Sequence, residues 1–284
     1  MQTKIKSSKS DVESESGLVV ERRFTSAGQD PFESFEWIEI DVQIRNPDGS
    51  MADSLEGVKL PSGFSGVPGT VCAQKYLRKA GVPKYLRTVP EDDVPIWLQR
   101  SEPDHERLQT VDAAERMGGE IDGRQLFRRL AGTWTYWGWK YGYFASEADA
   151  RAYFDEMCYL IASQRSAPNS PQWFNTGLHW AYGIEGPAQG HSYVDPDTGE
   201  LGKSTNAYEH PQPHACFIQS VSDSLVGGTD SIMGLWNREA LLFKYGSGTG
   251  SNFSNIRGKG EPLSGGGTSS CLLYTSDAAD EVDG

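Results

Sequence analysis

Hydrophobic residues recur at helical spacing in two neighbouring segments between residues 121 and 166. The first segment, DGRQLFRRLAGTWTYWGWKYGYF, has an aromatic-rich face made by Leu126, Phe127, Leu130, Trp134, Trp137 and Tyr141. The second, SEADARAYFDEMCYLIASQRS, begins with Ser146 and Asp149 in a capping-box arrangement, with Asp in place of the usual Glu or Gln. The spacing predicts two helices whose apolar faces form core, and a buried structural thiol at Cys158.

The stretch before these helices alternates short β-type runs with turn signals. VVERRF and FEWIEIDVQI, the latter followed by a loose NPDG turn, predict a small strand pair or hairpin within residues 18–60. Residues 61–122 are rich in proline, glycine and charge, which predicts irregular connections around a few short elements. The polar N-terminal residues, MQTKIKSSKSDVESESG, predict a disordered tail.

A proline-bounded segment, APNSPQWFN at residues 167–175, follows the second helix. Pro168 and Pro171 restrict the backbone, so Asn169 and Ser170 present their donors in fixed directions. Two interpretations stay open. The segment is a tight turn whose polar side chains serve the backbone, or it holds a phosphate group through Ser170 and nearby amides.

The run HACFIQSV has the length and apolar content of a strand. On a strand, Cys216, Ile218 and Ser220 share one face, because successive side chains alternate. The Cys216 thiol is then either a small core residue or a redox or nucleophilic group with a base or second thiol facing it. His214 lies two residues away, on the same side.

A helix followed by a glycine-rich loop is predicted in TDSIMGLWNREALLFKYGSGTGSNFSNIRGKG. Asp230 or Ser231 can cap the helix, and Gly246 ends it. The following GSGTGSN loop offers free amides, with Arg257 close behind, a combination that suits an anionic ligand. It matches neither a Walker motif nor a dinucleotide-binding fingerprint, so a mobile surface loop is the alternative.

Composition narrows the function classes. A length of 284 residues holds one large domain or two ordinary ones. The net charge of −13 argues against coating a nucleic acid but allows single nucleotides to bind. No run of about 18 apolar residues predicts a membrane span, and no signal peptide is evident. The four cysteines form no CxxC pair, so neither a zinc site nor a disulfide framework is expected, and a reducing cytoplasm is the default.

Several long segments, in order, resemble class II ribonucleotide reductase, the adenosylcobalamin-dependent type. They are NSPQWFNTGLHWAYGIEGPAQGH, HPQPHACFIQSVSD and LWNREALLFKYGSGTGSNFSNIRGKGEPLSGGGTSS, preceded by ERRFTSAGQDPFESFEW and WGWKYGYFASEADA. The likeness covers about residues 18–270. It implies an α/β fold in which a helical N-terminal region precedes the first part of a ten-stranded α/β barrel.

The resemblance also implies a division of the chain. A disordered tail would occupy residues 1–17 and a family-specific N-terminal region residues 18–120. The helical N-terminal domain would cover residues 121–166, and the start of the barrel domain residues 167–270.

Such enzymes make deoxyribonucleotides by radical chemistry. A radical generated from adenosylcobalamin passes to a cysteine, whose thiyl removes hydrogen from the ribose, and two further cysteines become a disulfide as the 2′-hydroxyl leaves as water. Cys216 resembles the first of these two reducing cysteines. Ser170, the Ala215–Cys216 backbone and Gly248 resemble substrate contacts. Whether the substrate is a diphosphate or a triphosphate stays open.

Regulation and partners are implied in the same way. Asp223, Ser224 and Leu225 resemble the start of an allosteric specificity site that reads a deoxynucleotide or ATP at the interface of a homodimer. Arg257 resembles a basic residue that binds the effector phosphates, whereas a second basic position is not evident in GEPLSGG. A thioredoxin-type reductant is the expected partner of the whole enzyme.

The remaining catalytic groups of the family lie later in such chains. Cys72 and Cys158 match none of them, so we expect this chain alone to be inactive. Two rivals stay open. One is the large subunit of a metal-radical ribonucleotide reductase, although the long insertion EGPAQGHSYVDPDTGELGKSTNAYEHPQPHACF favours the cobalamin type. The other is a stand-alone nucleotide-binding regulatory module.

The last fourteen residues, CLLYTSDAADEVDG, differ in character from what precedes them. The family would continue into a glycine and an apolar helix. The string CLLYTSDAADE instead resembles the translation of a transposon-end sequencing adapter. We therefore expect residues 271–284 to be an artefact, and Cys271 not to be a partner for Cys216.

Overall fold

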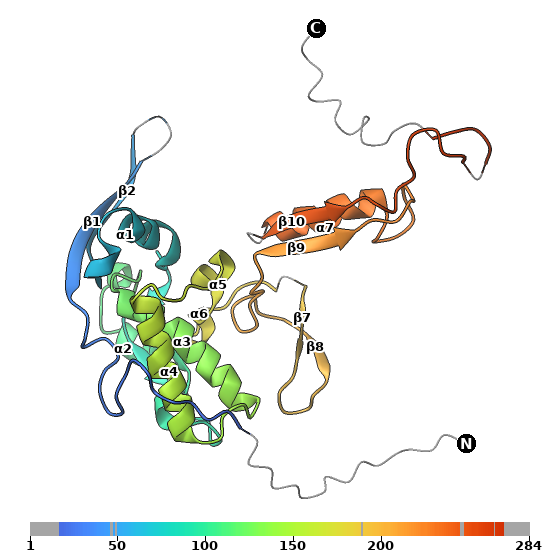
Figure 1. Cartoon of the computed structure of the whole chain (residues 1–284). Coiled ribbons are helices and arrows are strands. Elements are labelled where there is room, and N and C mark those ends of the chain that lie inside the picture. Colours follow the sequence, from blue (N-terminus) through green and yellow to red (C-terminus); the bar gives the residue numbers. More distant parts are fainter. Residues whose placement is uncertain are drawn as a thin grey trace, which may run out of the picture. The chain divides into compact units, whose positions relative to one another are not determined.

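The computed structural model describes residues 17–45, 48, 50–188, 190–244, 247–263 and 265–269 (Figure 1). The chain forms two compact units that divide between Pro213 and His214. Helices and strands mix in both, as the predicted α/β class requires. Each sheet within the described ranges has two strands, and none of them closes into a barrel. The predicted tail lies outside these residues except for Gly17, and residues 271–284 lie outside them entirely.

The first unit is built from short elements around two long helices (Figure 1). Its strands are β1 (Trp37–Arg45), β2 (Met51–Pro61), β3 (Val82–Pro83), β4 (Leu86–Thr88), β5 (Ser101–Pro103), β6 (Met117–Gly118), β7 (Ser192–Val194) and β8 (Leu201–Lys203). Its α-helices are α1 (Val67–Val71), α2 (His105–Leu108), α3 (Gly123–Lys140), α4 (Glu147–Ala162), α5 (Ser170–Asn175) and α6 (Leu178–Tyr182). The short elements between residues 61 and 122 confirm the prediction for that region.

The predicted hairpin is confirmed, because β1 and β2 pair antiparallel. Of its NPDG turn only Asp48 is described. The strand predicted for VVERRF is wrong. That segment is attached to the helices by other means: the Val20 amide donates to the Asp149 carboxylate at 2.9 Å, and the Phe24 amide donates to Glu156 at 3.0 Å. Its own backbone makes no ladder, so β-propensity alone misassigned it.

Helix α3 begins at a capping box that the sequence analysis missed. The Asp122 carboxylate accepts the Arg124 amide at 2.8 Å, and the Gln125 side chain accepts the Asp122 amide at 3.1 Å. Two donors of the first turn are thereby satisfied. Helix α4 begins as predicted at Ser146, whose hydroxyl oxygen accepts the Asp149 amide at 3.2 Å.

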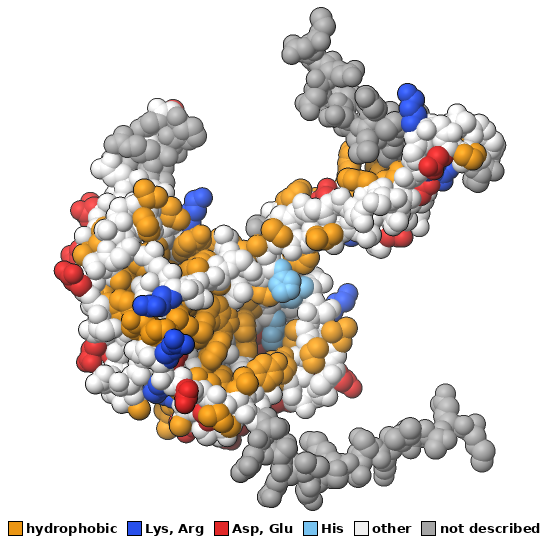
Figure 2. Space-filling view, in the orientation of Figure 1, with side chains coloured by type: hydrophobic (Ala, Val, Ile, Leu, Met, Phe, Trp, Pro, Cys, Tyr) orange, Lys and Arg blue, Asp and Glu red, His pale blue; other side chains and the backbone are white. Residues whose placement is uncertain are grey.

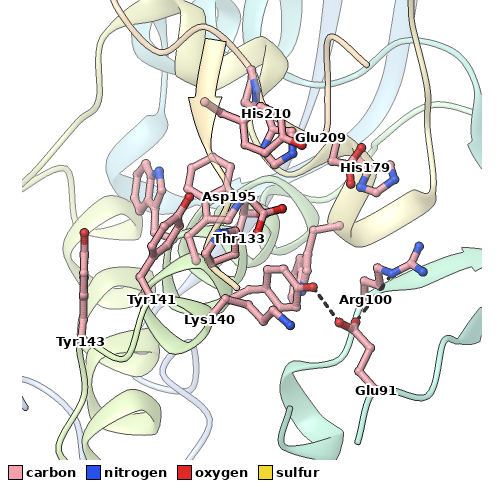
Figure 3. A pocket seen from close by; sticks show the side chains of 18 of the residues that line it. Glu91, Arg100, Thr133, Lys140, Tyr141, Tyr143, His179, Asp195, Glu209 and His210 are labelled. Atoms are coloured by element: carbon pink, nitrogen blue, oxygen red, sulfur yellow. Dashed lines mark hydrogen bonds and ion pairs between the residues drawn. The ribbon is translucent and has the colours of Figure 1, made fainter. Parts of the chain in front are cut away.

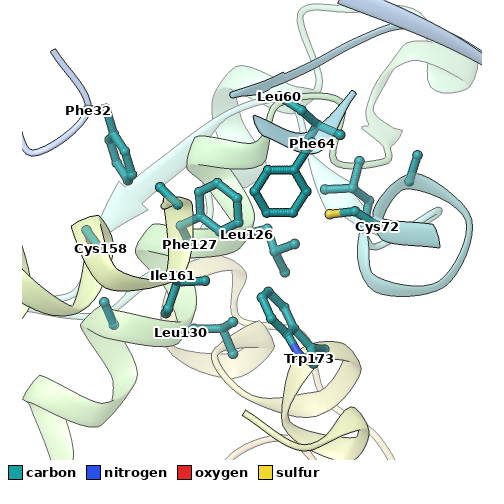
Figure 4. Packing of buried hydrophobic residues seen from close by; sticks show 14 of the residues in the cluster. Phe32, Leu60, Phe64, Cys72, Leu126, Phe127, Leu130, Cys158, Ile161 and Trp173 are labelled. Atoms are coloured by element: carbon teal, nitrogen blue, oxygen red, sulfur yellow. The ribbon is translucent and has the colours of Figure 1, made fainter. Parts of the chain in front are cut away.

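The apolar faces of α3 and α4 meet in the main core of the first unit (Figure 4). Leu126, Phe127 and Leu130 of α3 are fully buried, and Cys158 of α4 is buried as predicted. Trp134 of the predicted stripe is partly buried and packs against this core, whereas Tyr141, just after α3, is 39% exposed. The aromatic stripe therefore leaves the core in the second half of the helix.

The second unit contains β9 (Cys216–Ser220), α7 (Ile232–Lys244) and β10 (Gly248–Asn252). The strands pair parallel, with Gly248 opposite Cys216. The predicted GSGTGSN loop is thus wrong in large part, since five of its residues form β10. A small apolar cluster joins Val221, Ile232 and Leu235. The predicted helix end at Gly246 lies outside the described residues.

Candidate functional site

The Cys216 thiol is exposed at the first position of β9. Exposed and half-buried side chains alternate along this strand, so Cys216, Ile218 and Ser220 share its exposed face as predicted. Ile218 on that face is 90% exposed. The core-residue interpretation of Cys216 is therefore wrong for this unit, and the thiol is available for chemistry.

Gly248 of β10 provides the surface beside this thiol. Its amide donates to the Ala215 carbonyl at 2.5 Å. A Cβ atom at Gly248 would lie 3.7 Å from the Cys216 sulfur and 3.7 Å from the Ala215 oxygen. The absence of a side chain at Gly248 therefore leaves the sulfur next to bare backbone, where a ligand can approach closely. The structure brings Ala215, Cys216 and Gly248 together.

The other described thiols are in a different environment. Cys72 and Cys158 are 2% and 0% exposed. Burial raises the pKa of Cys72 to about 12, and burial raises the pKa of Cys158 as well. Because the thiolate is the reactive form, both are inert structural groups.

Helix α7 is fixed to both strands by charged side chains. The Glu239 carboxylate accepts the hydroxyls of Thr249 and Ser251, both at 2.8 Å. On the other strand, the Arg238 guanidinium donates to the Gln219 side chain at 2.7 Å. The sequence analysis missed these contacts, although two hydroxyls at alternate positions of one run mark one face of a strand.

The residues predicted for the effector site lie around the start of α7. The Asp223 carboxylate and the Arg257 guanidinium form an ion pair. The Ser224 carbonyl accepts the Ile232 amide at 2.9 Å, and the Leu225 carbonyl accepts the next amide of the helix at 3.1 Å. The structure thus brings Asp223 and Arg257 into contact and attaches Ser224 and Leu225 to the first turn of α7.

Ser170 is in the first unit, exposed, as the first residue of α5. The predicted tight turn at residues 167–175 is wrong, because residues 170–175 form this short helix. Pro171 in its first turn is compatible with a helix start, since the missing amide hydrogen has no helical acceptor there. Asn169 precedes the helix without a side-chain cap bond.

A buried guanidinium holds the far end of α5. Arg129 of α3 donates to the Trp173 carbonyl at 2.8 Å and to the Thr176 carbonyl at 2.6 Å. The same side chain forms an ion pair with Glu120, with 2.7 Å between Nε and Oε1. Both side chains are 0% exposed. Arg129 therefore neutralises a buried charge and satisfies the last carbonyls of the helix that begins at Ser170.

Glu120 extends this network to two further segments. Its carboxylate accepts the Arg78 amide and the Tyr182 hydroxyl, each at 2.8 Å. Burial raises the pKa of Tyr182, which keeps the hydroxyl protonated as a donor. Sequence analysis missed the pair, although an arginine between Leu126 and Leu130 on an apolar helix face was a usable signal.

In the described part of the chain, no group of three or more His, Cys, Asp and Glu side chains is placed to hold a metal ion. Likewise, no helix in these ranges has the length and hydropathy needed to cross a membrane.

Two family models match the chain. Residues 39–164 match "class II vitamin B12-dependent ribonucleotide reductase", and residues 214–282 match "ribonucleotide reductase, barrel domain". The second match begins where the second unit begins. It also runs through most of residues 271–284, so the adapter origin of that segment stays a prediction.

Curated relatives carry the same name. The chain is 60% identical over 265 residues to the vitamin B12-dependent ribonucleotide reductase of Agrobacterium fabrum. It is 57% identical to that of Bradyrhizobium diazoefficiens and 33% identical to that of Rhodopirellula baltica. These alignments cover 93%, 93% and 94% of this chain, but 21%, 21% and 22% of the relatives. The chain thus spans about a fifth of the length of the curated relatives it matches.

Proposed function

The chain belongs to the class II vitamin B12-dependent ribonucleotide reductase family, and on that premise we propose that it forms part of an enzyme that reduces ribonucleotides to deoxyribonucleotides. The observation that carries the proposal is the exposed Cys216 thiol beside Gly248 on two parallel strands. We further propose that β9 and β10 belong to the ten-stranded barrel of the family, and their parallel pairing across α7 supports this.

In this proposal Cys216 is one of the two thiols that supply electrons. The overall step is balanced when two thiols lose two hydrogens and become a disulfide while the 2′ carbon–oxygen bond breaks. One hydrogen joins the hydroxyl, which leaves as water, and the other forms the new carbon–hydrogen bond at the 2′ carbon. The second thiol is not assigned among the described residues. Cys72 and Cys158 are unsuitable because they are buried and burial raises both pKa values.

The substrate would contact the protein mainly through small groups. Bare backbone at Ala215 and Gly248 lets a ribose approach the Cys216 sulfur within van der Waals distance. The exposed Ser170 hydroxyl would add a hydrogen bond to the substrate. Diphosphate and triphosphate substrates both fit this description.

We propose that Asp223, Ser224, Leu225 and Arg257 contribute to an effector site for a deoxynucleotide or ATP. The Arg257 guanidinium supplies the positive charge that phosphate oxygens need. The Asp223 carboxylate holds that guanidinium in place until a stronger anionic partner arrives. A homodimer, a thioredoxin-type reductant and a cytoplasmic location belong to the same proposal.

The family depends on vitamin B12, and adenosylcobalamin would supply the radical when bound. The donors around Cys216 are one thiol, backbone groups and hydroxyls. They suit a ribonucleotide, but they do not form the broad apolar surface that a corrin ring requires. We therefore assign no described residue to the cofactor and derive no step through it.

A chimera tests the proposal. Residues 18–270 of this chain would replace the matching part of the Agrobacterium fabrum reductase, and vitamin B12-dependent deoxyribonucleotide formation would be measured. We expect activity in the chimera and its loss on Cys216→Ser. Ser220→Ala, on the same exposed face of β9, is the matched control and should retain activity. Full activity of the Cys216→Ser chimera would contradict the proposed role.

The regulatory module is the second candidate function, favoured by the Asp223–Arg257 pair. It is tested on this chain alone by melting temperature with and without ATP and deoxynucleotides, since a ligand of the native state raises stability. We expect a rise that Arg257→Gln removes. The module is supported over the enzyme when this rise occurs but the chimera is inactive.

A further inference from the structure

The first unit contains a cavity of about 950 Å³ that the proposed reductase site does not use. Its lining comes from the second half of α3, from α6, from the β7–β8 hairpin and from residues 208–211 (Figure 3). All of these segments belong to one compact unit. The volume is at the upper end of the range of ligand sites, roughly 300–1,000 Å³.

Aromatic side chains from four different segments line the cavity. They are contributed by α3, by α6, by the β7 strand and by the loop that follows α3, and include Trp137, Trp180, Tyr141, Tyr143 and Tyr193. Trp137 and Tyr141 belong to the stripe that leaves the core at the end of α3. In the space-filling view, histidine side chains lie beside hydrophobic ones on this unit (Figure 2). Aromatic faces attract cations and stack against flat apolar groups.

The two cations of the lining are already engaged. Arg100 Nε lies 3.6 Å from the Glu91 carboxylate, and Lys140 Nζ lies 3.0 Å from the Asp93 carboxylate. Their positive charge is therefore largely neutralised.

Four further carboxylates of the lining have no such counterion. Glu185, Glu209, Asp195 and Asp197 form no ion pair in the described part of the chain. The histidines of the lining do not offset the negative charge of these carboxylates. Burial lowers the pKa of His179 and of His210, which favours their neutral forms. The cavity is therefore negative at neutral pH, which disfavours phosphates and carboxylates and attracts cations.

A buried hydroxyl on the lining also lacks a partner. Thr133 is 3% exposed, and its Oγ1 has no hydrogen-bond partner among the described residues. A buried polar atom without a partner is energetically unfavourable, so such an atom marks a place where a ligand or water can bind. This observation is independent of the charge of the lining.

We propose that this cavity binds a small organic cation with a flat apolar part. The flat part would stack on the aromatic walls, and the charged group would face the carboxylates. The proposal does not rest on the reductase function. It concerns the first unit only, so its test is independent of the proposed role of Cys216.

Benzamidine, benzamide and benzoate provide a matched set of probes. They share one ring and carry a positive, zero or negative charge. Calorimetry on the chain should give benzamidine a dissociation constant of roughly a millimolar, as expected for so few atoms. Benzoate should bind at least about tenfold more weakly, because like charges repel. Acetamidine has the same cation without the ring and should also bind at least about tenfold more weakly.

Paired variants locate the binding. Glu185→Gln/Glu209→Gln removes two exposed carboxylates of the lining and should raise the dissociation constant of benzamidine roughly three- to tenfold. Glu106→Gln/Glu200→Gln removes two exposed carboxylates outside the lining and should change that dissociation constant less than about twofold. Unchanged melting temperatures would show that both double variants fold.

Three results would each overturn the proposal. They are no detectable benzamidine binding, equal binding of benzoate, and equal weakening by the two double variants. The last of these would show attraction by net charge alone. The expected order of probes together with selective weakening by the lining variant would support it.

Discussion

Arg129 and Glu120 form an ion pair at 2.7 Å whose two side chains are both completely buried. Lys84 and Glu115 form another pair at the same 2.7 Å, but their side chains are 41% and 62% exposed. The two ion pairs have the same distance but differ in exposure to water, so breaking them should change the free energy of unfolding by different amounts. Water can replace either partner of the exposed pair, whereas nothing replaces the partner of a buried charge.

Replacing Arg129 should therefore destabilise the first unit strongly. Arg129→Met leaves the Glu120 carboxylate buried without a counterion and releases the Trp173 and Thr176 carbonyls. We expect a loss of about 3–5 kcal/mol in the free energy of unfolding. Urea unfolding followed by tryptophan fluorescence measures it, because all tryptophans except Trp236 lie in the first unit.

The exposed pair supplies the control for this experiment. Lys84→Met should lower the free energy of unfolding far less than Arg129→Met does. The double variant Arg129→Met/Glu120→Gln should be more stable than Arg129→Met, since it removes the uncompensated charge. Equal effects of Lys84→Met and Arg129→Met would contradict this account of the buried pair.

Glu156 should make the stability of the chain fall in acid. Burial raises its pKa, but hydrogen bonds from Thr25 and from the Phe24 and Thr25 amides outweigh burial, so the net pKa is lowered. The unfolded chain then binds a proton more readily than the folded chain. The stabilisation is complete above the ordinary pKa of 4.5 and is lost as the pH falls through the lower folded value.

The measurement is urea unfolding between about pH 7 and pH 3. Glu156→Gln should lower the free energy of unfolding by about 1–3 kcal/mol at neutral pH. Its free energy of unfolding should also fall less steeply as the pH is lowered. Glu33→Gln, an exposed change in the same N-terminal part, is the matched control and should follow the unmodified chain. If the free energy of unfolding of Glu156→Gln fell with decreasing pH as steeply as that of the unmodified chain, Glu156 would be ruled out as the source of the fall.

The three described cysteines should differ sharply in reactivity. Cys216 is exposed, whereas Cys72 and Cys158 are buried with raised pKa values. In a Cys271→Ser background, iodoacetamide at neutral pH should modify Cys216 alone in the native chain. Mass spectrometry of tryptic peptides gives the extent at each site. Addition of urea should expose the other two, and their rapid native modification would disprove the burial argument.

Gly248→Ala should affect the thiol more than the fold. The added Cβ would meet the Cys216 sulfur and the Ala215 oxygen at 3.7 Å, which is ordinary van der Waals contact. We expect the free energy of unfolding to change by less than about 1 kcal/mol. Alkylation of Cys216 should slow, because the methyl group occupies the space beside the sulfur. Gly250→Ala, with nothing within 4 Å of its Cβ position, is the control.

Local patterns in the sequence predicted the helices and strand faces that local interactions determine. The helices α3 and α4 follow from apolar spacing at Leu126, Phe127 and Leu130 and from the cap at Ser146. The alternation along β9 likewise places Cys216 and Ile218 on one face, as predicted.

The features that the sequence analysis did not predict depend on contacts between segments that are distant in the sequence. Residues Gly248–Asn252 have low β-propensity and form a strand only because β9 lies beside them. The core-residue interpretation of Cys216 required the Cys216 face of β9 to be covered, and among the described residues of this unit that face is exposed. Arg129 was overlooked because its partners come from the segment before α3 and from α5, a relationship that spacing within one helix cannot reveal.

The parallel pairing of β9 with β10 also has a consequence for biosynthesis. A ribosome releases β9 first and then all of α7 before β10 can pair with it. The strands of the antiparallel β1–β2 ribbon are joined by a short turn, so only a few residues must be synthesised between them before they can pair. During translation the backbone of β9 is therefore unpaired for longer, because parallel pairing requires a long crossover. Nascent-chain chaperones should consequently bind the β9 segment in preference to the β1–β2 ribbon.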